Sequence, residues 1–314
     1  MKKILISFII LFTALKFCSA LVPLDAVDPL NYHLVISKYL VHGLWNEAWT
    51  TIPGSLMSGL FDFIYLIPHL VFDYGMASQI SSQILHLFFG LYLGSYLVFK
   101  NLRFRNEVFA LMAALSILSI ARSYNFFFMA KNDGALATVY LWTLIQLRKK
   151  NHILLAIGMG LLPAIKMNGL LYVAPVFIFF AFENRNLWRE VFKVSIISFI
   201  VFLPILMRNT YYMGNPLFPG LIKHIPGKAT AEMIQYYSEF MSNPISFKTL
   251  YLNVWHLFTG KLLFLAAPIF SFINFLDMNT NEMFRFYLLC FRFVYILQLM
   301  EVSSLIVFSS LPIL

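Results

Sequence analysis

The segment Asp28-Pro29-Leu30-Asn31-Tyr32-His33-Leu34 directly follows the first long apolar run of the chain, residues 4–22. An acidic segment with a histidine is costly to hold beside a membrane span unless water or chemistry uses it. Asp28 followed by Pro29 is also typical of a helix N-cap with proline at the first helical position, so capping and catalysis both stay open for this carboxylate. Asp28, Tyr32 and His33 are therefore the first candidate site residues.

The composition indicates an integral membrane protein. Of the 314 residues, 60% are hydrophobic and 12% are charged, and the mean hydropathy is +0.77. Soluble domains usually have about 25% charged residues, so roughly half of the charge typical of a soluble domain is missing. The net charge of +9 does not indicate a nucleic-acid partner, because the basic residues stand in short clusters between apolar runs.

The apolar runs predict an all-α fold, a polytopic transmembrane helix bundle of about 9–10 spans. The candidate runs cover residues 4–22, 56–74, 82–99, 107–122, 133–147, 152–166, 168–182, 191–207, 251–275 and 285–312. The first run is interpreted as an uncleaved span rather than a signal peptide, because many further runs follow it. In both interpretations, Leu21 and the residues after it are delivered to the outside.

Basic clusters predict which ends of the runs face the cytoplasm. The clusters are Lys2/Lys3, Lys100/Arg103/Arg105, Arg148/Lys149/Lys150 and Arg185/Arg189/Lys193. The pattern is consistent throughout if the run 56–74 lies on the outer membrane surface or re-enters from it instead of crossing. Several distant polar residues then come to one outer face: Asp28, His33, Lys131, Asp133, Lys166, Arg208 and the segment 214–219.

These runs and loops form one integral-membrane domain, residues 1–314. Its predicted parts are a first span (1–22), an outer loop with juxtamembrane helices (23–81), central spans (82–208), an outer loop (209–250) and C-terminal spans (251–314). The expected location is a membrane, with the candidate site residues at its outer face.

Lys131 and Asp133 stand together at the start of the run 133–147. Asp133 can simply favour the helix N-terminus, but the adjacent lysine is not explained in that way. Lys166 and Arg208 each end an apolar run, where a basic side chain often reaches out to the membrane interface. Alternatively, two or three such cations on one face would bind a phosphate or pyrophosphate.

Other motifs carry less chemistry. His86 is expected to be an interior histidine, and Gly90-Leu91-Tyr92-Leu93-Gly94 is expected to be a helix-packing face. The sequence contains no phosphate-binding glycine loop, no dinucleotide fingerprint, and neither HExxH nor CxxC, so it does not support a nucleotide-driven pump or a structural zinc site.

At the polar residues, the sequence resembles the integral-membrane GT-C glycosyltransferases, in particular the bacterial branch similar to protein O-mannosyltransferases and the lipid A aminoarabinose transferase. The resemblance covers most of residues 1–220. It rests on D-x-L-x-Y-H-L at 28–34, K-x-D at 131–133, Gly160…Lys166-x-x-Gly169, and Arg208-Asn209…Gly214-Asn215-Pro216-Leu217-Phe218-Pro219.

The resemblance implies a GT-C-like bundle with a large first outer loop, a sugar donor on a polyprenyl phosphate, and a protein, lipid or polysaccharide acceptor. It also implies a location in the bacterial inner (plasma) membrane, with the active face toward the periplasm. Asp28 would be the catalytic carboxylate and Asp133 the second acidic residue. The residues that would bind the donor phosphate or substrate are Lys131, Lys166, Arg208, His33, Tyr32 and Asn215. No cofactor or metal site is expected; a divalent metal is compatible with this chemistry but not required.

Two alternatives stay open. A transporter or flippase of lipid-linked sugars would use the same cations and make no bond. Members of the resembling family usually continue through more helices, whereas this chain ends at Leu314, so an inactive, C-terminally truncated homologue is the second alternative.

Overall fold

The computed structural model describes residues 2–22, 33–51, 55–57, 59–94, 96–97, 130, 132–184, 186–219, 222 and 224–235. All secondary-structure elements in these ranges are helical, which confirms the predicted all-α fold. They are α1 (Lys2–Ala20), α2 (Leu34–Val41), α3 (Trp45–Thr50), η2 (Ser55–Met57), η3 (Leu60–Tyr65), α4 (Leu66–Phe72), α5 (Met76–Leu87), η4 (Phe88–Leu93), α9 (Asp133–Arg148), α10 (His152–Ile165), η5 (Met167–Gly169), α11 (Leu170–Glu183) and α12 (Trp188–Met213). Apart from residues 2–13 and Gln235, the described residues belong to one compact unit, Ala14–Arg103 with Tyr124–Ile234.

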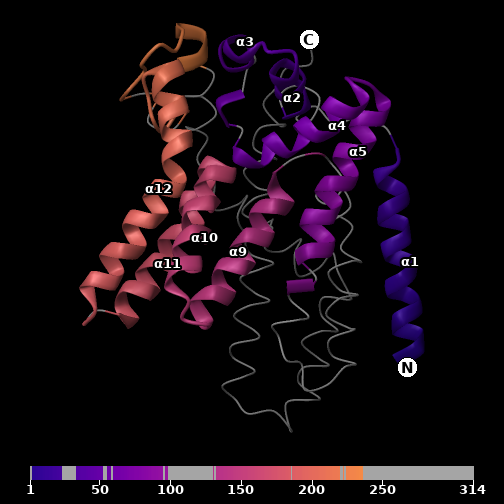
Figure 1. Cartoon of the computed structure of the whole chain (residues 1–314), viewed down its shortest axis with the longest axis horizontal. Coiled ribbons are helices and arrows are strands. Elements are labelled where there is room, and N and C mark those ends of the chain that lie inside the picture. Colours follow the sequence, from indigo (N-terminus) through magenta and orange to yellow (C-terminus); the bar gives the residue numbers. More distant parts are fainter. Residues whose placement is uncertain are drawn as a thin grey trace, which may run out of the picture. The chain divides into compact units, whose positions relative to one another are not determined.

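Helices α9, α10, α11 and α12 lie side by side in this unit, and α10 packs mainly against α9 and α12 (Figure 1). Small residues on α10 allow this close packing. A Cβ atom on Gly158 would overlap the Thr143 hydroxyl of α9, and one on Gly160 would overlap the Ser198 carbonyl oxygen of α12. The Ser198 hydroxyl donates to the Ala156 carbonyl oxygen at 2.9 Å, so a polar contact also joins α10 to α12.

The described helices do not confirm the predicted count of about 9–10 spans. Among them, α12 alone is long and apolar enough to cross a membrane; Ile6–Ala20, Leu60–Phe72, His152–Ile165 and Met167–Glu183 are apolar but shorter. A 14-residue helix covers about 21 Å, whereas the hydrocarbon core is about 30 Å thick. The runs 107–122, 251–275 and 285–312 lie outside the described residues.

The run 56–74 does not form one long helix. It divides into η2, η3 and α4, and α4 packs against α2 and α5. Polar groups of this run are buried inside the protein: the His69 ring donates from Nδ1 to the Tyr65 carbonyl oxygen at 2.7 Å and stacks on Tyr74. Burial, as the largest cause, lowers the pKa of His69. The segment 23–81, where juxtamembrane helices were predicted, contains α2 directly after His33, with Leu34, Ile36 and Leu40 buried.

The Gly90–Gly94 motif packs against α9, as expected. It lies at the end of the π-helical turn η4, where the hydroxyl of Thr138 donates to the Phe89 carbonyl oxygen at 2.9 Å. A Cβ atom on Gly94 would lie 3.0 Å from the same hydroxyl oxygen. A π-turn leaves backbone carbonyls without their usual helical partners, and a side chain of α9 supplies one here.

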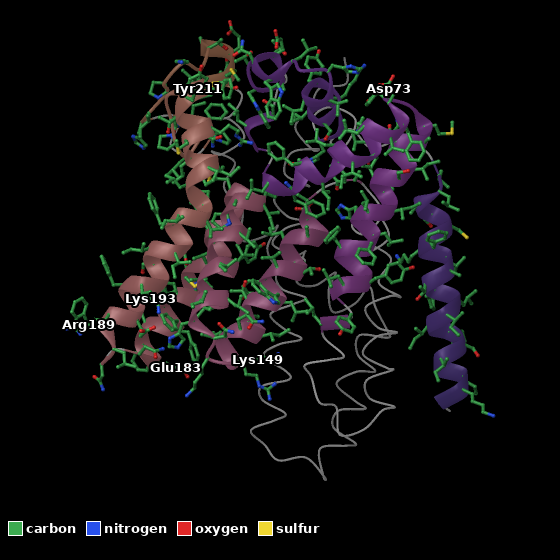
Figure 2. All side chains as sticks on the ribbon, viewed as in Figure 1. Asp73, Lys149, Glu183, Arg189, Lys193 and Tyr211 are labelled. Carbon is green, nitrogen blue, oxygen red and sulfur yellow. The ribbon has the colours of Figure 1, made fainter. Side chains whose placement is uncertain are left out.

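Charged side chains mark the two ends of the helices. Lys149, Glu183, Arg189 and Lys193 gather at one end of the α9–α12 group, and Asp73 and Tyr211 lie at the opposite end (Figure 2). The C-terminal part of α12 therefore reaches the end at which η3 and α4 lie (Figure 1). Gly214, in the left-handed conformation at φ +69°, ends α12.

Replacing Gly160 with alanine tests the α10–α12 contact. Because the new methyl group would overlap backbone atoms of α12, we expect the free energy of unfolding to fall by about 1–3 kcal/mol. The control is Gly75→Ala, because Gly75 has extended backbone and open space around it; its effect should stay within about 0.5 kcal/mol. Denaturant unfolding of the purified chain in detergent measures both, and equal stability of the two variants would contradict the packing described here.

Candidate functional site

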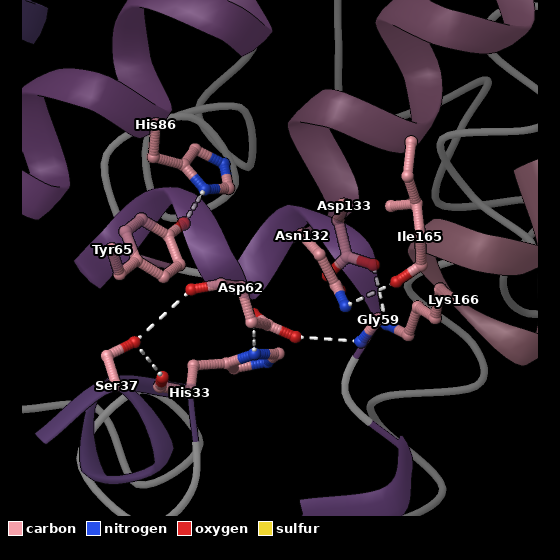
Figure 3. Close-up of polar contacts among 10 residues, drawn as sticks. All are labelled: His33, Ser37, Gly59, Asp62, Tyr65, His86, Asn132, Asp133, Ile165 and Lys166. Carbon is pink, nitrogen blue, oxygen red and sulfur yellow. Dashed lines mark hydrogen bonds and ion pairs between the residues drawn. The ribbon is translucent and has the colours of Figure 1, made fainter. Parts of the chain in front are cut away.

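A buried histidine–carboxylate pair lies at the start of α2. His33 Nδ1 is 2.6 Å from Asp62 Oδ1, and the two side chains are each 2% exposed. The second carboxylate oxygen, Asp62 Oδ2, accepts from the backbone N–H of Gly59 at 2.9 Å, as a carboxylate does at the third position of a helix. The Ser37 hydroxyl lies within hydrogen-bond reach of the carbonyl oxygens of both His33 and Asp62 (Figure 3). Both oxygens of this carboxylate are therefore satisfied.

An ion pair joins the start of α9 to the end of α10. Lys166 Nζ lies 2.5 Å from Asp133 Oδ1, and the Asp133 side chain is 8% exposed. Beside this pair, the Asn132 side-chain amide donates to the Ile165 carbonyl oxygen at 3.0 Å, one of the carbonyls that a helix end leaves without a partner. Asp133 and Lys166 therefore form an ion pair that joins two helix ends, in addition to any role of Asp133 at the helix N-terminus or of Lys166 at the membrane interface.

Gly59 brings the two pairs together. A Cβ atom at this position would overlap the carbonyl oxygens of Ala164 and Ile165, so only glycine allows η3 to approach the end of α10. The N–H of the same glycine binds Asp62, and Lys166 directly follows Ile165. His33–Asp62 and Asp133–Lys166 thus lie on the two sides of one backbone contact (Figure 3).

A tyrosine–histidine pair adds to this network. Tyr65 Oη and His86 Nδ1 are 3.1 Å apart, and both side chains are fully buried. A Cβ atom on Gly134 would lie 2.8 Å from His86 Nε2, which places this ring against the start of α9. Burial, followed by the negative charges of Asp62 and Asp133, raises the pKa of Tyr65 well above its usual value. The phenol therefore stays protonated, and His86 has a partner in the interior, as predicted.

Arg208 approaches the same region from α12. Its Nη2 donates to the Leu56 carbonyl oxygen at 3.0 Å, and its guanidinium carbon lies 4.5 Å from the centre of the Trp49 ring. Asp62 lies close enough for a favourable electrostatic interaction with this cation. The Nη1 group is buried and has no hydrogen-bond partner among the described residues. Arg208 thus keeps donor capacity after its structural contacts are made.

Asn215 stabilises the loop that follows α12. Its side-chain Nδ2 donates to the Ile225 carbonyl oxygen at 2.9 Å, and its Oδ1 accepts from the backbone N–H of Leu217 at 3.0 Å. Asn209 supports the same loop by donating to the carbonyl oxygens of Pro216 and Phe218. The predicted substrate-binding residue Asn215 therefore has a clear structural role.

The structure brings together four of the predicted site residues: His33, Asp133, Lys166 and Arg208. Asp28, Tyr32 and Lys131 lie outside the described residues. Asp62, Gly59, Tyr65 and Trp49 were not predicted as site residues. The Gly59-x-x-Asp62 spacing, typical of a capped helix start, could have identified one of these contacts. In the described ranges, no group of three or more His, Cys, Asp or Glu residues is arranged to hold a metal ion.

The arrangement offers buried carboxylates with fixed positions and polar atoms for a ligand. Besides Arg208 Nη1, the side-chain oxygens of Asn132 and Asn168 are buried and have no hydrogen-bond partner among the described residues. Buried polar atoms are normally paired, and those that are not require an explanation. Each of these three atoms can form one further hydrogen bond, Arg208 Nη1 as a donor and the two amide oxygens as acceptors.

Replacing Asp62 with asparagine tests the pairing with His33. We expect the free energy of unfolding to fall by about 1.5–3 kcal/mol, because the buried histidine loses a charged hydrogen-bond acceptor. Asp73→Asn is the matched control: Asp73 is 78% exposed and pairs with His42 at 3.5 Å, so its loss should cost less than about 1 kcal/mol. Unfolding in denaturant compares the two variants, and an Asp62→Asn chain as stable as the control would exclude a stabilising pair.

Comparisons of this chain with protein-family models, with characterised proteins and with solved structures gave no significant match. The family resemblance therefore rests on the sequence motifs, and the assignment of a function rests on those motifs together with the geometry of the site.

Proposed function

We propose that the chain is a GT-C-like membrane glycosyltransferase that transfers a sugar from a polyprenyl-phosphate donor to an acceptor at the outer face of the bacterial inner membrane. The observation that carries this proposal is the convergence of His33, Asp133 and Lys166 through the contact between Gly59 and the end of α10. These residues come from three separate segments of the chain, and each was expected at the same face from sequence.

The membrane location is supported by the surface and the charges of the helices. Large apolar side chains are exposed along α11 and α12: Leu171, Ile178, Phe182, Phe192, Phe199, Ile200 and Met207. Contact with lipid would remove these side chains from water, which is energetically favourable. Lys149, Arg189 and Lys193 lie at the end opposite to Tyr211 (Figure 2). Basic residues at this end are the pattern expected if the end that carries them faces the cytoplasm. The proposed bundle has about 9–10 spans and a large first outer loop.

Arg208 is the proposed ligand of the donor phosphate. Its Nη2 and Nε groups donate to the Leu56 carbonyl oxygen and to Asn209 Oδ1, and the buried Nη1 is left to donate a charge-assisted hydrogen bond to a phosphate oxygen. The Lys166 ammonium is held by Asp133, so its positive charge is largely compensated and its position is fixed. Asn132 and Asn168 offer acceptors for sugar hydroxyls. Lys131, Tyr32 and His33 complete the proposed substrate contacts.

In the proposed mechanism, Asp28 accepts the proton of an acceptor hydroxyl or amine. The acceptor atom forms a bond to the anomeric carbon while the bond from this carbon to the phosphate oxygen breaks, which inverts the configuration. The polyprenyl phosphate leaves with the bonding electron pair. General-base catalysis contributes about 10²–10⁴-fold, and fixed positive charge at the leaving phosphate contributes further. Because a lipid phosphate is a good leaving group, no metal is needed.

Replacing Asp28 with asparagine tests the base. We expect kcat for transfer of a labelled polyprenyl-phosphate sugar to fall by about 10²–10⁴-fold, because the amide cannot accept the proton. Asp25→Asn in the same segment is the control and should keep normal transfer. Transfer by Asp28→Asn at the wild-type rate would remove Asp28 from catalysis. If the wild-type chain in vesicles moves the intact donor from one leaflet to the other and does not consume it, the chain is a flippase.

Replacing Arg208 with glutamine tests the phosphate ligand. Loss of a charge-assisted hydrogen bond should raise KM for the donor roughly 10–100-fold. The lysine variant, which keeps the charge but not the planar fork, should give an intermediate value. Arg189→Gln, at the opposite end of α12, is the matched control (Figure 2). Donor KM values that are equal in the Arg208 and Arg189 variants would contradict the assignment.

A further inference from the structure

A cavity of about 170 Å³ lies at the end of the unit that carries Lys149, Arg189 and Lys193, away from the candidate site. It is lined by Leu147, Lys150, His152, Phe180, Glu183 and Asn184, where the turn between α9 and α10 meets the turn between α11 and α12. A cavity of this volume holds several waters. It is large enough for a small polar group and too small for a sugar nucleotide.

The cavity is lined by one exposed cation, Lys150, and one exposed anion, Glu183, which form no ion pair with each other. His152 Nδ1 lies 3.2 Å from Glu190 Oε2, so Glu190 already has a partner. Lys150 and Glu183 both line the cavity, and neither forms an ion pair with any residue in the described part of the chain. A simple anion would be repelled by Glu183, and a simple cation by Lys150. A zwitterion, with an acidic group and an ammonium group, matches both.

Large apolar side chains are exposed beside the cavity, among the charged residues of this end (Figure 2). Phe179, Phe182, Leu187 and Trp188 are exposed on the adjoining ends of α11 and α12. The Arg189 guanidinium lies 5.8 Å from the centre of the Trp188 ring, and tryptophan is enriched at the interface between membrane and water. A polar cavity beside exposed apolar helices fits an amphiphile: the polar group enters the cavity, and acyl chains cover the helices.

We propose that this cavity binds the headgroup of a zwitterionic aminophospholipid, with the phosphate at Lys150 and the ammonium group at Glu183. The inference rests on the membrane location in the proposed function but not on sugar transfer. The occupant is a lipid of the cytoplasmic leaflet, because basic clusters mark this end of the helices as cytoplasmic. A bound lipid would join the α9–α10 turn to the α11–α12 turn.

The test measures lipid binding to the purified full-length chain in detergent by native mass spectrometry. Phosphatidylethanolamine should bind about tenfold more tightly than phosphatidylglycerol, because phosphatidylglycerol has no ammonium group for Glu183. Glu183→Gln should weaken phosphatidylethanolamine binding about tenfold and abolish this preference. Glu47→Gln is the control, because Glu47 is an exposed carboxylate on α3, far from the cavity in sequence and packing.

Equal binding of the two lipids, or equal binding by the two variants, would overturn the proposal. Free phosphoethanolamine that binds as tightly as the lipid would also overturn it, since the site would then recognise a soluble compound. None of these results affects the transfer assay on Asp28→Asn. Conversely, a chain that binds phosphatidylethanolamine but consumes no lipid-linked sugar would contradict only the proposed function.

Discussion

The ion pair between Lys166 and Asp133, with the Asn132–Ile165 hydrogen bond beside it, fixes the end of α10 against the start of α9. A buried charge without its partner is strongly destabilising, so the two helix ends are held in register by the same groups that form the site. Gly59 packs against the Ile165 carbonyl oxygen, and its backbone N–H donates a hydrogen bond to Asp62, which positions this carboxylate. The position of the His33–Asp62 pair therefore depends on the geometry at the end of α10.

Much of the helical core could be predicted from sequence. The runs 133–147, 152–166 and 168–182 match α9, α10 and α11 closely, because charged or turn-forming residues stop both the apolar run and the helix. The run 191–207 underestimates α12, which continues to Met213. The apolar run ends at the polar residues Arg208-Asn209-Thr210, but the helical hydrogen bonds of the backbone continue through these residues and end at Gly214. The short helices within 56–74 could not be predicted, since their polar residues are buried by contacts with α2 and α5.

The residues of the site were easier to predict than the pairs that they form. His33, Asp133, Lys166 and Arg208 are conspicuous because charged or titratable groups are rare in an apolar chain. Their partners come from distant segments: Asp62 is 29 residues from His33, and Lys166 is 33 residues from Asp133. No local pattern encodes such pairs. The contact of Arg208 with Trp49 has no sequence signal, and the Asp28 segment, which carries the proposed base, lies outside the described residues.

The central claim is that the site and the basic clusters face opposite sides of a membrane. Thiol labelling of single-cysteine chains, with Cys18 and Cys290 replaced by serine, tests it most directly. Tyr211 is exposed beside the site end and Lys149 is exposed at the other (Figure 2). With a membrane-impermeant reagent on intact spheroplasts, Tyr211→Cys should react at once and Lys149→Cys only after permeabilisation. Reaction of both cysteines from the same side would contradict the proposed topology and, with it, a periplasmic transferase site.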